Sequence, residues 1–144
     1  ECHVHAGITP EDVTKKLNSM NDTELVIHPE CGCTTPFMYD VADGSFDNNK
    51  VSILSTEGML NHVSKSKSKN FVVATETGIL YKMRKDNPDK KFIAASEKAE
   101  CQYMKMITLQ NVHDALVREQ NVVTVPKEIA DKARIAIDRM LAIS

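Results

Sequence analysis

Short β-branched runs alternate along the first two thirds of the chain with segments of helical period. The runs at 24–28, 51–54, 70–75 and 90–95 predict strands, because each is brief, apolar and bounded by turn residues. Helices are expected after Cys33 towards Asp40, at 58–66 and at 76–87, with loop material at 43–50. Strand, turn and helix recurring at this spacing predict an α/β fold with right-handed βαβ units on a parallel sheet.

Two further regions have clear helix signals. Thr9 as N-cap, Pro10 at the first helical position and acidic Glu11 and Asp12 predict a helix running to about Met20. The tail predicts a helix at 109–119, a short strand at 121–125 and a long amphipathic helix that begins at Pro126.

The composition is that of an ordinary globular protein. The 144 residues carry a formal net charge of -2, with 42% hydrophobic and 26% charged residues, so one domain is the first expectation and no nucleic-acid or membrane partner is indicated. Aromatic residues at 5% offer no platform for stacking bases. The apolar runs are shorter than the roughly 20 residues that cross a bilayer, and a cytoplasmic location is predicted.

Four cysteines, at positions 2, 31, 33 and 101, do not form the dense pattern of a small secreted scaffold. In a reducing compartment, metal binding or catalysis is the better expectation. Cys31 and Cys33 are one residue apart, which matches neither a Cys-x-x-Cys redox motif nor a zinc ribbon.

Polar residues follow each predicted strand. In parallel α/β sheets, ligands bind beyond the carboxyl ends of the strands. Four groups of polar residues should therefore meet at one edge of the sheet. These are His28 with Glu30, Ser55 with Thr56, the segment 75–77, and Cys101.

Each group has a structural and a functional interpretation. The segment IHPECGC is either a turn with buried thiols or a place where His28 and Glu30 point the same way, towards a substrate contact or a proton transfer. LSTEG is either a helix cap or a binding site for phosphate or carboxylate. For TETG the cap is favoured more strongly.

The first residues hold Cys2, His3 and His5, which are metal-ligand types. Natural amino termini are usually polar and loosely held, so this opening predicts that the chain is a fragment of a longer protein.

Five segments, taken in order, resemble quinolinate synthase: CHVHAGITPEDV, IHPECGC, LSTEGML, VATETGILYKMRKDNPDKKF and CQYMKMITL. The resemblance covers nearly the whole chain. It implies three similar α/β/α domains around a pseudo-threefold axis, of which residues 1–101 would be the third, a three-layer domain with a short parallel sheet. Residues 102–144 would be a strand and helix tail that packs back on the missing first domain.

The resemblance also implies an activity and a cofactor. The family condenses iminoaspartate with dihydroxyacetone phosphate to quinolinate in NAD biosynthesis, using a [4Fe-4S] cluster with one open iron as Lewis acid. Cys2 and Cys101 would be two of its three thiolate ligands, and the third ligand would lie outside this chain. The fragment alone is then expected to be inactive.

Site residues follow from the same motifs. His28 and Glu30 match the catalytic residues implicated in proton transfer, whereas His5, Ser55 and Thr56 match substrate-binding positions; His3 has no such match. Partners implied are the two substrates, the missing domains and L-aspartate oxidase as a candidate, with no nucleic acid and no membrane. Cys31 and Cys33 would be features of a subset, and 34–50 an insertion that is a lid or, with slight preference, a decoration.

Two other hypotheses stay open from the residues. One is a non-catalytic α/β binding module regulated by metal or thiols through Cys31 and Cys33. The other is a phosphate-binding α/β domain that uses Ser55 and Thr56 alone.

Overall fold

A computed structural model describes residues 2–143 and divides into two compact units. The first extends to Gln102 and the second begins at Tyr103.

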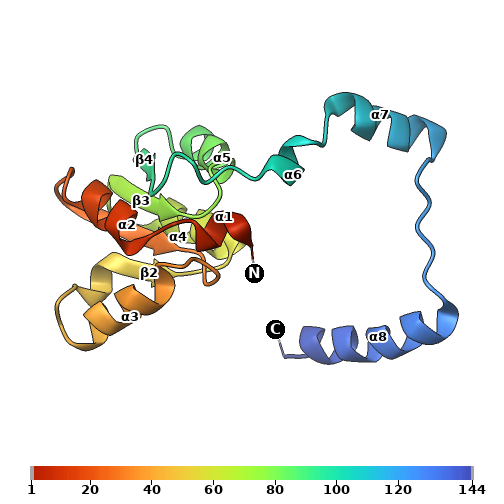
Figure 1. Ribbon diagram of the computed structural model, residues 1–144, viewed down its shortest axis with the longest axis horizontal. Coiled ribbons are helices and arrows are strands. Elements are labelled where there is room, and N and C mark those ends of the chain that lie inside the picture. The colour runs from red at the N-terminus through yellow and green to blue at the C-terminus, as the bar shows by residue number, and fades with distance from the viewer. Residues whose placement is uncertain (1, 144) are drawn as a thin grey trace. The chain divides into compact units, whose positions relative to one another are not determined.

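The first unit is built on a four-stranded parallel sheet (Figure 1). Its strands are β1 (Thr23–Ile27), β2 (Val51–Ile53), β3 (Asn70–Ala74) and β4 (Lys91–Ala94), in the spatial order β2-β1-β3-β4. All neighbouring pairs are parallel. The register aligns Ile27 with Ile53 and with Ala74, so the carboxyl ends of three strands lie together at one edge.

Helices cover both faces of this sheet. Two separate hydrophobic clusters show the arrangement, because successive strand residues point to opposite faces. Leu25 and Val72 pack in one cluster with residues of α1 (His3–Ala6), α2 (Pro10–Leu17) and α3 (Thr34–Ala42). Val26 and Val73 pack in the other with residues of α4 (Thr56–Lys65) and α5 (Ile79–Asp86). The predicted α/β class and the three-layer α/β/α arrangement are therefore confirmed.

The helix starts follow local capping chemistry. Thr9 and Asp12 form a capping box at α2, as their positions predict, although the helix ends at Leu17 and not near Met20. Helix α5 begins at Ile79 and not at Glu76, because the Glu76 carboxylate accepts a hydrogen bond from the backbone N–H of Gly78 and the intervening residues form a turn.

The segment 34–50 is partly structural. Phe37 of α3 is buried, and its ring meets that of Phe46 edge to face. A short 3₁₀ helix, η1 (Asn48–Lys50), then leads into β2. The first half of this segment thus contributes to the core.

The remaining helices are α6 (Gln102–Lys105), at the boundary of the units, α7 (Leu109–Arg118) and α8 (Lys127–Leu141). The strand predicted at 121–125 is wrong: these residues form no strand. Val122 and Val123 remain 79% and 86% exposed, and no strand within residues 2–143 pairs with them. A β-branched run becomes a strand only where a partner supplies the hydrogen-bond ladder. No helix in the described range is long and apolar enough to cross a membrane.

Candidate functional site

Polar side chains follow β1 and β3 at the aligned edge of the sheet. The ladder continues one step past the strands, because the His28 N–H donates to the carbonyl of Ala74 over 3.1 Å. On the other side, the Leu54 N–H donates to the carbonyl of Ile27 over 2.9 Å. These bonds fix where the segments after β1, β2 and β3 leave the sheet.

His5 joins this edge from α1. Its ring is buried, and Nε2 lies 2.8 Å from the Thr75 hydroxyl in a buried hydrogen bond. Nδ1 lies 3.3 Å from a carboxylate oxygen of Glu30 but has no hydrogen-bond partner among the described residues. A buried polar atom that lacks a hydrogen bond lowers the stability of the fold. Nδ1 therefore marks a position where a polar group of a ligand would supply the missing hydrogen bond.

His28 stacks on His5. The ring centroids are 4.4 Å apart and the planes differ by 5°. Burial lowers the pKa of His28, the neighbouring His5 lowers it further, and the Glu30 carboxylate only partly opposes them. His28 is therefore neutral at neutral pH and able to accept a proton.

A tight turn holds the Glu30 carboxylate near the Nδ1 atoms of both rings, 3.3 Å from that of His5 and 4.0 Å from that of His28. The Gly32 N–H donates to the carbonyl of His5 over 3.0 Å, which ties the turn to α1. A side chain at Gly32 would bring its Cβ to 3.1 Å from the carbonyl oxygen of Ala6, a close approach that favours glycine at this position. Cys31 and Cys33 close the turn with a disulfide, and both are buried.

His5, His28 and Glu30 are also donors that could hold a metal ion, since one ligand atom of each lies within 4.8 Å of the others. The stacked rings argue against this use. An imidazole binds a metal through a lone pair in its own plane, and two parallel rings direct those lone pairs into separate planes. The arrangement favours proton transfer and hydrogen bonding to a ligand.

Ser55 and Thr56 follow β2 at the same edge and begin α4. The Ser55 hydroxyl accepts the Gly58 N–H over 3.2 Å, so the capping interpretation holds for this residue. Both residues are exposed. The amino terminus of a ten-residue helix remains suited to an anionic group.

Cys2 and Cys101 are the chain's free thiols, since the other two cysteines form the disulfide. Both are half-buried and pack against the hydrophobic cluster that contains Leu25. Cys2 is the N-cap of α1, and Cys101 lies in the connection that follows β4. Thiolates are the protein ligands of iron–sulfur clusters, so these two residues fit part of a three-thiolate set.

The amino-acid sequence matches one family model, described as Quinolinate synthetase A protein, over residues 1–142. The chain belongs to the quinolinate synthase family. It is 45% identical over 140 residues to the quinolinate synthase of Pyrobaculum aerophilum, covering 97% of this chain and 45% of that protein. The enzyme of Thermus thermophilus is 42% identical over 143 residues, covering 99% of this chain and 44% of the relative. That of Mycobacterium leprae is 41% identical over 143 residues, covering 99% and 41%.

The chain therefore spans less than half the length of these quinolinate synthases. Of the residues singled out from the sequence, the fold brings His5, His28 and Glu30 into contact and places Ser55 and Thr56 at the same sheet edge. Their roles, and the ligand roles of Cys2 and Cys101, stay predictions. The sequence predicts Thr75 only as a residue of the sheet edge, from its position directly after β3, and does not predict its contact with His5.

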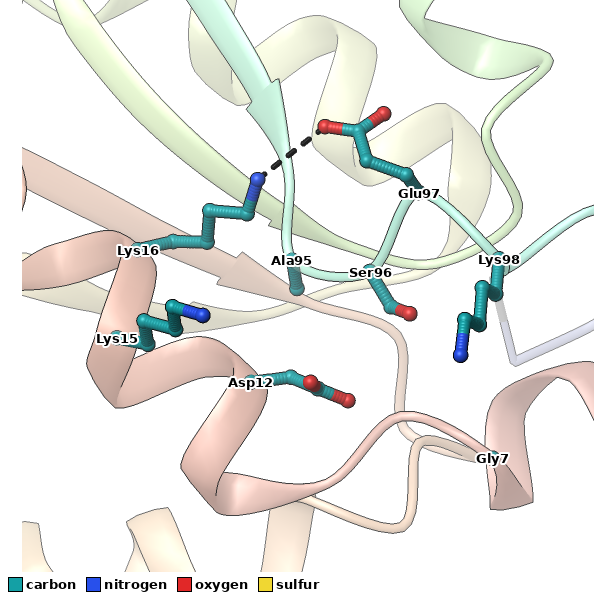
Figure 2. Close-up of a pocket in the computed structure, with 8 residues that line it drawn as sticks. All are labelled: Gly7, Asp12, Lys15, Lys16, Ala95, Ser96, Glu97 and Lys98. Atoms are coloured by element: carbon teal, nitrogen blue, oxygen red, sulfur yellow. Dashed lines mark hydrogen bonds and ion pairs between the residues drawn. The ribbon is translucent and has the colours of Figure 1, made fainter.

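A separate pocket of about 380 Å³ lies between α2 and the connection after β4 (Figure 2). Three lysine ammonium groups and two carboxylates share it, and Lys16 pairs with Glu97 over 3.2 Å. Its lining consists of Gly7, Asp12, Lys15, Lys16, Ala95, Ser96, Glu97 and Lys98. The lining therefore carries charges of both signs, with one more lysine than carboxylates.

Proposed function

We propose that this chain is the carboxy-terminal portion of a quinolinate synthase, the enzyme that condenses iminoaspartate with dihydroxyacetone phosphate to quinolinate for NAD biosynthesis. The observation that carries the proposal is the contact among His5, His28 and Glu30 at the sheet edge, in a chain that belongs to this family. Residues far apart in sequence meet there, and one of them keeps a buried nitrogen without a hydrogen bond.

His28 and Glu30 are proposed to transfer protons. A neutral imidazole accepts a proton, and a carboxylate that is 63% exposed can pass it to another group or to water. His5, fixed by Thr75, presents Nδ1 to a polar group of the substrate. Ser55 and Thr56 would bind carboxylate or phosphate oxygens at the start of α4.

Cys2 and Cys101 are proposed as two of three ligands of a [4Fe-4S] cluster, with the third on the part of the enzyme outside this chain. When bound, such a cluster supplies a Lewis-acidic iron for dehydration. Two thiolates do not complete the ligand set, so the 144-residue chain alone is expected to be inactive.

The remaining domains of the enzyme are proposed as the partners of this chain, with residues 102–144 packing back on the first domain. Their exposed apolar side chains, among them Leu109 at 90% and Leu116 at 75%, support such packing. L-Aspartate oxidase remains a candidate partner, and a cytoplasmic location belongs to the same proposal.

The test is anaerobic reconstitution of the complete enzyme with iron and sulfide. Visible cluster absorption is expected in the unaltered protein and should be lost in Cys2→Ser and in Cys101→Ser. Cys33→Ser is the matched control, since Cys33 lies in the disulfide and is expected to leave the absorption unchanged. Stable four-iron binding and turnover by the isolated chain would contradict the proposal.

The Cys31–Cys33 disulfide favours one second candidate, a thiol-regulated binding module without catalysis. In that case, replacing both cysteines by serine would abolish function, while Cys2→Ser would leave it intact. The quinolinate synthase proposal expects the reverse.

A further inference from the structure

The segment TETG after β3 has no role in the function proposed so far. The cap predicted for this segment is not formed in the usual way, because α5 has no side-chain cap at its N-cap residue, Gly78. Instead, the Gly78 N–H donates to Oε2 of Glu76 over 2.6 Å. The other carboxylate oxygen, Oε1, accepts the backbone N–H of Cys101 over 3.3 Å. Glu76 thus joins the end of β3 to the residue that carries a free thiol.

The position of this carboxylate is set sterically as well. A Cβ added at Gly78 would lie 2.7 Å from Glu76 Oε2, which is closer than a carbon and an oxygen atom normally approach, so the flexible carboxylate would have to shift. Glycine at position 78 therefore leaves the carboxylate free to occupy the position in which it bonds both N–H groups.

A second contact holds the same connection. The Thr77 N–H donates to the carbonyl of Ala99 over 2.8 Å, and the Ala99 side chain is buried in the core. The adjacent Thr75 holds His5, whose helix begins after Cys2. Three successive residues after β3 therefore fasten both thiol-bearing segments to one strand.

We propose that Glu76 is a positioning residue for Cys101. Its carboxylate bridges the Gly78 and Cys101 N–H groups and so fixes the backbone from which the Cys101 thiol projects. That Cys101 is held in place to serve as a cluster ligand rests on the proposed function. Its position alone can be measured in the chain without iron.

The experiment measures the rate at which iodoacetamide alkylates each free thiol in the iron-free 144-residue chain, resolved by peptide mass spectrometry. Glu76→Ala removes both bonds, of which one holds Cys101. The loss of that one hydrogen bond, at ordinary net strength, is expected to raise the Cys101 alkylation rate about fivefold. Glu76→Gln keeps one acceptor oxygen and should give a smaller rise. Gly78→Ala keeps the charge but shifts the carboxylate, and should give a rise smaller than that of Glu76→Ala.

Cys2 is the internal reference, and its rate should not change. Glu97→Gln is the control. It removes a carboxylate from the same connection after β4, but that carboxylate bonds Lys16 (Figure 2). If Glu76 served only as a helix cap, Glu76→Ala would lower the melting temperature and leave Cys101 alkylation below that temperature unchanged. An unchanged Cys101 rate in Glu76→Ala would overturn the proposal.

In the complete enzyme, Glu76→Ala should also lower the iron content after reconstitution, whereas Glu97→Gln should not. An unaltered enzyme that takes up no cluster would refute the proposed function, yet the alkylation rates would still decide the placement of Cys101. The two failures are therefore distinguishable.

Discussion

At the scale of single residues, the site depends on the electrostatics of two stacked imidazoles. The ring centroids are 4.4 Å apart, so a positive charge on one imidazole would repel a positive charge on the other. Burial acts in the same direction on His28, and only Glu30 opposes it. His28 is therefore neutral near neutral pH, which suits a site that moves protons.

The titration of His28 follows from these contacts. Its pKa should lie below the ordinary value of about 6.5, and Glu30→Gln should lower it further because the opposing carboxylate charge is gone. NMR titration of the imidazole resonances measures both values. Glu11→Gln, which alters an exposed carboxylate in α2, should leave the His28 midpoint in place.

The same shift affects stability. The folded-state pKa of His28 lies below the unfolded value, so between the two the unfolded chain binds more protons. The contribution of the neutral His28 to the free energy of unfolding is fully present above about pH 6.5. It is lost as the pH falls from there through the lower pKa of the folded state. A His28 midpoint at or above about 6.5 would contradict the assignment.

At the scale of elements, helix starts are the best predicted features, because capping is local chemistry. Thr9 at the start of α2 accepts the Asp12 N–H while the Asp12 carboxylate accepts the Thr9 N–H. Thr9→Ala should lower the free energy of unfolding by about 1 kcal/mol in urea denaturation. Thr14→Ala, at an exposed interior position of the same helix, should be neutral or slightly stabilising, since alanine is the better helix former. Equal losses in both variants would contradict the capping role.

The four strands of the sheet were predictable for a similar reason, since each carries its own apolar signature. What sequence alone left open was set by contacts that no sequence pattern marks. The late start of α5 depends on the Glu76 carboxylate, and the exposed run at 121–125 depends on a partner strand that the described residues do not supply. The sheet edge could be inferred from the strand ends, but the His5–Thr75 contact spans seventy residues and has no local signal.

At the scale of the whole molecule, the two units differ in what stabilises them. The first contains both hydrophobic clusters, whereas α6, α7 and α8 bury no side chain as the structure describes them. Apolar burial is the dominant favourable term in folding, so helices without it are marginal in water. The stability of the chain should therefore reside in the first unit.

Hydrogen exchange of the 144-residue chain tests this difference. Amides of β1 and β3, the central strands, should exchange slowly, because their opening requires loss of the core. Amides of α7 and α8 should exchange within the fastest class, and trypsin should cut in the tail well before it cuts the sheet. Deleting residues 106–144 should leave the exchange of β1 and β3 unchanged. Slow exchange in α8 of the isolated chain would instead mean that the tail is stable without the domains proposed to pack against it, and would contradict that proposal.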